Sequence, residues 1–177
     1  VAWPDGSPLT GNDYVFTLKI LFHPGLNAQI FRSYFPDLND VVVDPANPKK
    51  FTVYFNKFFM LGVDAICQIP VLPAYHYDPG KWMIDVPLAD LIDEAKATTL
   101  MESNPKMAAF ADNYNNPKYD NDPASVVGSG PYQMVQFNAD QNVVLVKKTN
   151  WWGDAVTKTR PLLAAYPDTI EYRFIKD

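Results

Sequence analysis

The sequence contains a single cysteine, Cys67, among 177 residues. One cysteine cannot form a disulfide within the chain, and it excludes every zinc site that needs two or more thiolates. Cys67 stands in the apolar stretch 64–69, which predicts a buried, unreactive thiol rather than a nucleophile. The sequence also lacks a run of about eighteen apolar residues, so we expect no part of it to span a membrane.

Clustered basic residues are missing too. The chain has 15 Lys and Arg against 20 Asp and Glu, which gives a formal net charge of −5. Its densest basic spots are only pairs, Lys49–Lys50 and Lys147–Lys148. Phosphate backbones are bound through larger clusters of Lys and Arg. Nucleic acid is therefore not an expected partner.

No catalytic signature is complete. Ser129 has glycines as its direct neighbours, but a nucleophile elbow needs them two residues away, where Val127 and Pro131 stand. The segment is not a phosphate loop either, because no Gly-Lys-Ser or Gly-Lys-Thr follows it. Ser129 is predicted to be a turn residue. We therefore expect no enzyme.

Metal-binding patterns are incomplete as well. His23 and His76 are far apart and lack a Glu-x-x-His partner, which excludes the zinc-protease pattern. Residues 120–122, Asp-Asn-Asp, resemble the beginning of a calcium loop, but Ala124 and Ser125 replace the next ligand and the glycine. A solvated turn is the better interpretation. The sequence predicts no metal site and no cofactor.

Proline and aromatic residues are abundant: the chain has 16 prolines and 14% aromatic residues, but only 8 glycines. Proline divides a chain into short elements, and aromatic side chains supply large contact areas, a composition that suits a protein which presents surfaces. With 47% hydrophobic and 20% charged residues the chain is of the globular class. Its length fits one domain or two small lobes.

The most informative stretch is 127–153. Gly-Ser-Gly-Pro at 128–131 predicts a tight turn that needs glycine. Residues 132–137 alternate between apolar and polar with one slip, and residues 143–146 form a β-branched run, so together they predict a β-hairpin. The stretch ends with two large aromatics beside a glycine.

Capping and periodicity signals predict the other elements. Thr10 is a candidate N-cap, and Asp13 stands in the first turn, where its negative charge interacts favourably with the helix dipole. The expected elements are a helix over 10–22, a short helix over 28–34, a hairpin of strands 40–44 and 51–55, a buried helix over 58–69, an amphipathic helix over 87–103, a helix over 105–111, a polar loop over 112–124 and a strand over 169–175.

Three segments together resemble one protein family, the family 5 extracellular solute-binding proteins. Residues 5–13, Asp-Gly-Ser-Pro-Leu-Thr-Gly-Asn-Asp, are similar to a family segment that opens a helix, with Gly11 where alanine is usual. Val-Gly-Ser-Gly-Pro-Tyr at 127–132, then two strands, then Lys-Lys-Thr-Asn-Trp-Trp-Gly at 147–153 resemble its internal signature. Residues 70–78 look like its Leu-Pro-x-His segment.

The resemblance implies a mixed α/β (α+β) fold, a portion of a bilobal type II periplasmic-binding-protein fold with antiparallel hairpins and packed helices. Residues 1–73 would be part of the smaller lobe. Residues 74–177 would be part of the first ligand-binding lobe, with a helical insertion at about 87–112. Family members are far longer, and Val1 is not an initiator methionine, so we expect an internal fragment that binds ligand weakly, if at all, by itself.

The resemblance also implies a function without catalysis: to bind an extracellular or periplasmic solute, a peptide in the first place, and deliver it to the permease subunits of an ABC importer. The protein would be periplasmic or on the surface of a bacterium, and would meet the membrane only through the permease or through a lipoprotein anchor outside this chain. Sugars, nickel complexes and haem remain open as ligands. The alternative is an interaction module that presents an aromatic surface to a protein partner.

Trp151 and Trp152 have two interpretations. Paired aromatics at a strand end usually close a hydrophobic core. Alternatively, one of them lines a ligand cleft, where an indole offers contact area without demanding a particular side chain. In the family the segment after this pair approaches the ligand, so the resemblance adds Gly153 and Asp154 to the candidate ligand-binding residues.

Overall fold

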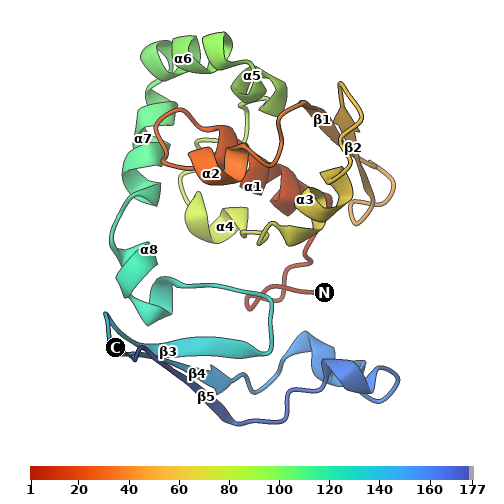
Figure 1. Cartoon of the computed structure of the whole chain (residues 1–177), viewed down its shortest axis with the longest axis vertical. Coiled ribbons are helices and arrows are strands. Elements are labelled where there is room, and N and C mark those ends of the chain that lie inside the picture. Colours follow the sequence, from red (N-terminus) through yellow and green to blue (C-terminus); the bar gives the residue numbers. More distant parts are fainter. Residues whose placement is uncertain (176–177) are drawn as a thin grey trace. The chain divides into compact units, whose positions relative to one another are not determined.

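The structure is a computed structural model that describes residues 1–175. The chain divides into two compact units (Figure 1). We call Thr10–Asn115 the helical unit, and Val1–Leu9 together with the chain from Asn116 onward the sheet unit. Each unit is described by itself.

The helical unit contains seven helices and one hairpin within its described residues. In chain order they are α1 (Gly11–Phe22), α2 (Gln29–Arg32), β1 (Leu38–Val43), β2 (Phe51–Phe55), α3 (Gly62–Gln68), α4 (Ala74–Tyr77), α5 (Leu88–Ile92), α6 (Glu94–Ser103) and α7 (Pro105–Tyr114). The strands β1 and β2 pair antiparallel, with Val41 opposite Val53. The predicted hairpin and the predicted helices over 10–22 and 105–111 are confirmed, although α7 is longer than expected.

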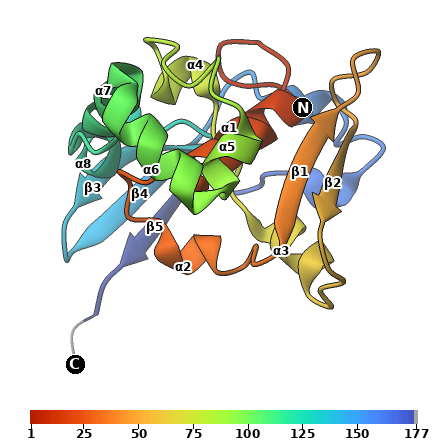
Figure 2. The ribbon, with the colours of Figure 1, turned by 90° about the horizontal axis from the view of Figure 1, so that it is seen from above.

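Helix α1 is the centre of the helical unit. It begins after Thr10 as predicted: the backbone nitrogen of Thr10 donates to Oδ2 of Asp13 at 2.8 Å, and Oγ1 of Thr10 accepts from the backbone nitrogen of Asn12 at 3.2 Å. This capping box satisfies amides that would otherwise lack partners. Figures 1 and 2 show α5 and the β1–β2 hairpin beside α1, and Leu18 of α1 and Phe110 of α7 are completely buried.

The predicted amphipathic helix over 87–103 is broken at Asp93. There the backbone is extended, and the Asp93 carboxylate accepts from the backbone nitrogen of Lys96 at 3.1 Å, so Asp93 ends α5 and caps α6. Two helices with a cap at Asp93 are favoured over one continuous helix because the N-cap side chain satisfies free backbone amides of the second helix. The break also changes the buried face: Ala97 of α6 is buried, whereas Ala95, which lies on the apolar face of a continuous helix over 87–103, is exposed.

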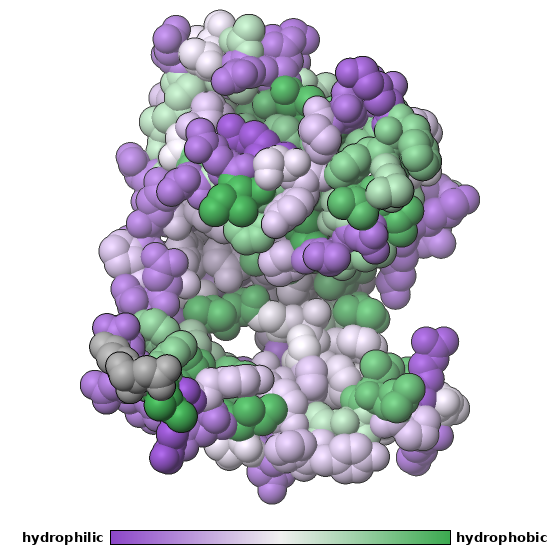
Figure 3. Space-filling model, viewed as in Figure 1, coloured by the Kyte–Doolittle hydropathy of each residue, from purple (hydrophilic) through white to green (hydrophobic). Residues whose placement is uncertain are grey.

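The predicted buried helix over 58–69 is wrong in extent and in burial. Helix α3 begins at Gly62, which is its one buried residue, and Phe58 before it is 95% exposed. Cys67 is exposed, so the prediction of a buried thiol is wrong as well. A continuous apolar run becomes buried only where another layer covers it, and the described chain supplies none here. Figure 3 shows hydrophobic surface over the segment between β2 and α3.

The sheet unit is built on three antiparallel strands in the order β3–β4–β5. Its elements are α8 (Lys118–Asn121), a 3₁₀ helix η1 (Pro123–Ser125), β3 (Tyr132–Asn138), β4 (Asn142–Lys147), η2 (Trp152–Ala155), η3 (Pro161–Leu163) and β5 (Thr169–Arg173). The predicted hairpin and the predicted final strand are confirmed. The register shifts between Met134 and Gln136, so the slip in the alternation of 132–137 is a β-bulge.

The predicted polar loop over 112–124 contains short helices instead. Helix α7 continues to Tyr114, and α8 and η1 follow it. Asp122 caps η1 by accepting from the backbone nitrogen of Ala124 at 3.0 Å. Asn, Asp and Pro favour both turns and helix starts, so their density does not separate a loop from a series of one-turn helices.

The division into units also differs from the boundary predicted between residues 73 and 74. Nζ of Lys19 in α1 donates to the backbone oxygen of Met83 at 2.8 Å, and α1 contacts α4 and α5. A cut after residue 73 would therefore pass through the packed core of the helical unit. The assignment of 1–73 and 74–177 to lobes of a longer protein stays a prediction.

His23 is a fully buried titratable residue at the end of α1. Its Nδ1 accepts from the backbone nitrogen of Gly25 at 3.1 Å, so the proton of the neutral ring is on Nε2, which has no hydrogen-bond partner in the described chain. Burial lowers the pKa of His23 to about 4; the Met107 backbone acts in the opposite direction, and the charge of Arg32 lowers it further.

The helical unit should lose stability as the pH falls from about 6.5 toward 4. In this window an unfolded histidine binds more protons than buried His23, so protonation favours the unfolded chain. We expect a loss of about 1–2 kcal/mol between pH 7 and 5, measured by urea unfolding. The substitution His23→Gln should remove most of this pH dependence. Two results would contradict the prediction. One is that the free energy of unfolding of His23→Gln depends on pH as steeply as that of the wild type. The other is that the His23 imidazole, assigned by NMR in the His76→Gln variant, titrates near pH 6.5.

Candidate functional site

The predicted site residues lie in the sheet unit, where the chain leaves β4 and enters η2. Both indoles donate to the same atom, the backbone oxygen of Ser129: Nε1 of Trp151 at 2.9 Å and Nε1 of Trp152 at 2.8 Å. The two ring centroids are 5.1 Å apart. A carbonyl oxygen accepts two hydrogen bonds, so this one is saturated.

Lys148 reinforces the same connection. Its Nζ donates to the backbone oxygen of Gly128 at 2.6 Å, and its backbone nitrogen donates to the oxygen of Pro131 at 2.8 Å. Burial lowers the pKa of the Lys148 ammonium. We call Ser129, Lys148, Trp151 and Trp152 the Ser129 brace. It joins the two halves of the 127–153 motif, the turn before β3 and the segment after β4.

The glycines of this motif have different roles from those predicted. Neither Gly128 nor Gly130 has a positive φ, and a Cβ at either would meet no atom within 4 Å, so the prediction that this turn needs glycine is wrong. Gly153 is the constrained position. A Cβ there would overlap the six-membered ring of Trp151, which the bond to Ser129 holds in place.

A pocket of about 200 Å³ lies beside the brace. Trp3, Ser129, Lys148, Asn150, Trp151 and Trp152 are among the residues that line it. Small-molecule sites usually enclose about 300–1,000 Å³, so this pocket has room for one side chain rather than a whole peptide. Trp3 is buried, and its Nε1 has no hydrogen-bond partner among the described residues.

The structure brings together some of the predicted site residues. Trp151 is buried and Trp152 half-buried, and both line the pocket. Gly153 and Asp154 do not line it: Gly153 is buried under Trp151, and Asp154 is exposed. The geometry combines both interpretations of the tryptophans, because they close a packed cluster and still present ring surface to a cavity. A role of these four residues in ligand binding stays a prediction.

Sequence reasoning missed Trp3 and Lys148. Trp3 belongs to the N-terminal turn of residues 1–9, whose proline and glycine signals predict a turn and say nothing about its tertiary partner. The sequence marks Lys148 only as one member of a basic pair. The aromatic content near a glycine-rich turn was the available signal for an aromatic cluster.

Neither a metal-binding cluster nor a membrane-spanning helix is present in the part of the chain that the structure describes. Among residues 1–175, no group of three or more His, Cys, Asp or Glu side chains is placed to hold a metal ion. Within the same residues, no helix has the length and apolar character needed to cross a membrane.

Comparison with known proteins identifies the family. Residues 1–177 match the family model of the bacterial extracellular solute-binding proteins, family 5 Middle. The chain therefore belongs to this family, as the resemblance of the three segments predicted. A search of curated protein sequences gave no significant match.

Solved structures share the fold. The ABC transporter substrate-binding protein CtaP from Listeria monocytogenes matches 100% of this chain with 28% of its own, at 19% identity and a TM-score of 0.58. An oligopeptide-binding protein from Thermus thermophilus, complexed with a pentapeptide, matches 98% with 27% of its own, at 19% identity and a TM-score of 0.58. NikZ from Campylobacter jejuni, in complex with Ni(L-His), matches 86% with 23% of its own, at 20% identity and a TM-score of 0.53.

This chain thus spans about a quarter of the length of the solved relatives it matches. The predicted fold class, a mixed helix and antiparallel-sheet portion of a periplasmic binding protein, is confirmed.

The Ser129 brace predicts unequal effects of glycine substitution. Gly153→Ala should destabilise the sheet unit by about 1–3 kcal/mol, because the new methyl group overlaps the Trp151 ring. Gly130→Ala is the matched control, and it should change the free energy of unfolding by less than about 0.5 kcal/mol. Urea unfolding followed by tryptophan fluorescence measures both.

A double-mutant cycle tests the cause. Trp151→Phe replaces the indole with a smaller side chain that does not reach residue 153. Gly153→Ala should therefore lower the free energy of unfolding less in the Trp151→Phe background than in the wild type. An equal loss of stability in both backgrounds would show that the Trp151 ring is not the reason why residue 153 has to be glycine.

Proposed function

We propose that this chain is part of a solute receptor of an ABC importer and that its solute is a peptide. Family membership over the whole chain carries the proposal. The oligopeptide-binding relative from Thermus thermophilus, solved with a pentapeptide, supports the choice of a peptide. The NikZ structure with Ni(L-His) keeps a metal chelate as the next candidate. The proposed role is to bind the solute and release it to a permease, with no chemical step.

The proposed setting follows from the same family. The receptor acts in the periplasm or at the cell surface of a bacterium, and the permease subunits are its protein partners. Contact with the membrane is indirect, through the permease or through a lipid anchor outside this chain.

The pocket at the Ser129 brace is the proposed subsite for one side chain of the peptide. Both indole N–H groups of Trp151 and Trp152 are used on Ser129, so only ring surface faces the ligand. Ring surface binds aliphatic, aromatic and cationic side chains alike. Such a subsite suits a receptor that accepts peptides of varied sequence. Gly153 and Asp154 stay proposed ligand contacts beside it.

The interaction module stays a second candidate because of one observation. The helical unit exposes large apolar side chains before and within α3: Phe58 is 95%, Met60 79% and Val63 73% exposed. Exposed apolar groups that cluster in this way mark surfaces that another protein surface covers. A titration with small solutes separates the two candidates, because a solute receptor binds a small solute and an interaction module does not.

Calorimetric titration of the complete gene product with a pool of di- to pentapeptides tests the proposal. Peptide should bind, and Trp152→Ala should weaken binding about fivefold or more, since a ring face of the subsite is lost. Trp152→Phe retains ring surface and should bind more tightly than Trp152→Ala. Tyr166→Ala removes an exposed aromatic elsewhere in the sheet unit and should leave affinity unchanged.

Three results would count against parts of the proposal. Binding of an oligosaccharide or a nickel chelate without binding of peptides would change the solute class. No binding of any solute would favour the interaction module. A micromolar dissociation constant for a short peptide on the 177-residue chain alone would contradict the expectation that this chain binds weakly by itself.

A further inference from the structure

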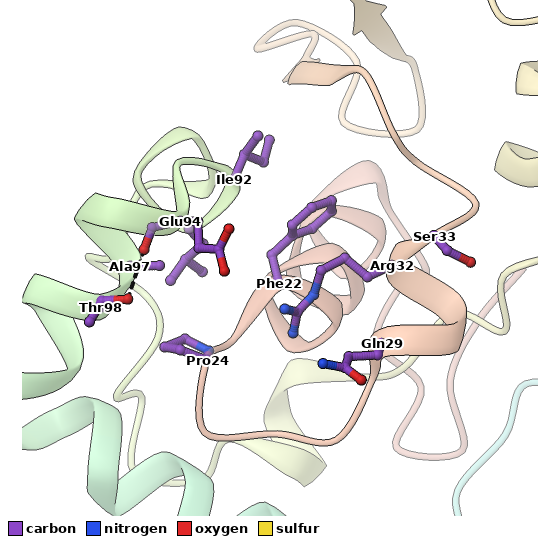
Figure 4. A pocket seen from close by; sticks show the side chains of 10 residues that line it. Phe22, Pro24, Gln29, Arg32, Ser33, Ile92, Glu94, Ala97 and Thr98 are labelled. Carbon is purple, nitrogen blue, oxygen red and sulfur yellow. Dashed lines mark hydrogen bonds between the residues drawn. The ribbon is translucent and has the colours of Figure 1, made fainter.

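A groove of about 610 Å³ lies in the helical unit, at the C-terminal end of α1 and between α2 and the α5–α6 segment (Figure 4). Its volume is in the range of small-molecule sites. Phe22, Pro24, Ile92 and Ala97 supply apolar walls. The residues of the Ser129 brace all belong to the other unit, so this groove is a separate feature.

Arg32 of α2 faces this groove with a fixed guanidinium group. Its Nε donates to the backbone oxygen of Leu21 at 2.9 Å, and one terminal nitrogen donates to the oxygen of His23 at 3.4 Å. These bonds use two of its five N–H donors and leave three for a ligand. No carboxylate of residues 1–175 pairs with Arg32. A half-buried guanidinium held in this way is suited to bind a carboxylate through two parallel hydrogen bonds.

Glu94, the first residue of α6, stands on the opposite wall. Figure 4 shows its carboxylate and the Arg32 guanidinium both near Phe22, and no ion pair joins the two groups. The side chain of Thr98 donates to the backbone oxygen of Glu94, not to the carboxylate, and Asp93 caps the helix. Within the described residues the Glu94 carboxylate has no ion pair. Two opposite charges thus border one groove, and neither neutralises the other.

We propose that this groove binds a small zwitterion, a free amino acid or a dipeptide, with its carboxylate on Arg32 and its ammonium group on Glu94. A ligand of this kind complements both charges at once. A simple anion would bind to Arg32 but would be repelled by Glu94. A simple cation would bind to Glu94 but would be repelled by Arg32. An apolar side chain of the ligand lies against Phe22 and Ile92. The proposal is independent of peptide binding at the Ser129 brace.

Removal of one ligand charge at a time tests this assignment. The probes are leucyl-leucine, its N-acetyl derivative and its C-terminal amide, titrated into the ¹⁵N-labelled 177-residue chain. Leucyl-leucine should shift the amide signals of Gln29, Ala97 and Thr98. The amide should bind about tenfold more weakly, because charge-assisted bonds to half-buried Arg32 are lost. The acetylated form should bind about threefold more weakly, because Glu94 is exposed.

Two variants connect each ligand charge to one residue. Glu94→Gln should lower affinity for leucyl-leucine to that of the acetylated form and leave the acetylated form unaffected. Arg32→Lys keeps the charge but loses the two-pronged geometry, so it should weaken leucyl-leucine several-fold and leave the amide unaffected. Glu102→Gln on the same helix and Arg160→Gln in the sheet unit are matched controls that should change nothing.

The assignment is overturned by equal binding of the three probes, by shifts confined to residues outside the groove, or by no shifts at tens of millimolar probe. Failure of the proposed function would appear differently. Trp152→Ala should leave this titration unchanged, and loss of peptide binding at the Ser129 brace would not alter the response of Gln29, Ala97 and Thr98.

Discussion

The hydrogen bonds from two indoles to one carbonyl oxygen organise the sheet unit. Because Ser129 accepts from both Trp151 and Trp152, the turn before β3 is joined to the segment after β4 at the same end of the sheet. Both lone pairs of the carbonyl are used, which fixes the two rings. The fixed ring of Trp151 in turn leaves no space for a Cβ at residue 153. The motif of residues 127–153 therefore has a structural role, which is to hold this end of the sheet together. The surface that it can offer a ligand is the part of the two indole rings that is not packed inside the protein.

Local signals predicted the fold where the chain itself satisfies its polar groups. The capping box of Thr10 and Asp13 marked the start of α1, and the slip near Val135 in an alternating strand was a bulge. Prediction failed where two local signals compete or where burial depends on another layer. Apolar periodicity ran through Asp93, but its cap ended one helix and began the next. The exposure of Cys67 depends on what covers α3, which no local pattern records.

The candidate site was predictable only in part, for a related reason. Adjacent tryptophans beside a glycine are conspicuous in a sequence, so Trp151 and Trp152 were found. Trp3 and Lys148 reach the same pocket from a distant turn and from the end of β4, and only the tertiary structure shows that they meet. The groove of Arg32 and Glu94 is a stronger case. Each is an ordinary charged residue of a helix, and the significance of the pair is that neither has an ion-pair partner among residues 1–175.

The two cavities impose opposite demands on a ligand. At the Ser129 brace the indole donors are satisfied within the protein, so a change of ligand leaves no buried donor without a partner. Broad selectivity is then possible without a penalty for each poor match. In the groove, no ion pair among the described residues compensates the charge of Arg32 or Glu94, so a ligand of the proposed kind that lacks one matching charge leaves one of them without a counter-charge, at the greater cost for half-buried Arg32. Saturated polar groups permit variety, and unsaturated charges enforce selection, so the hydrogen-bond inventory of each cavity separates a tolerant subsite from a selective one.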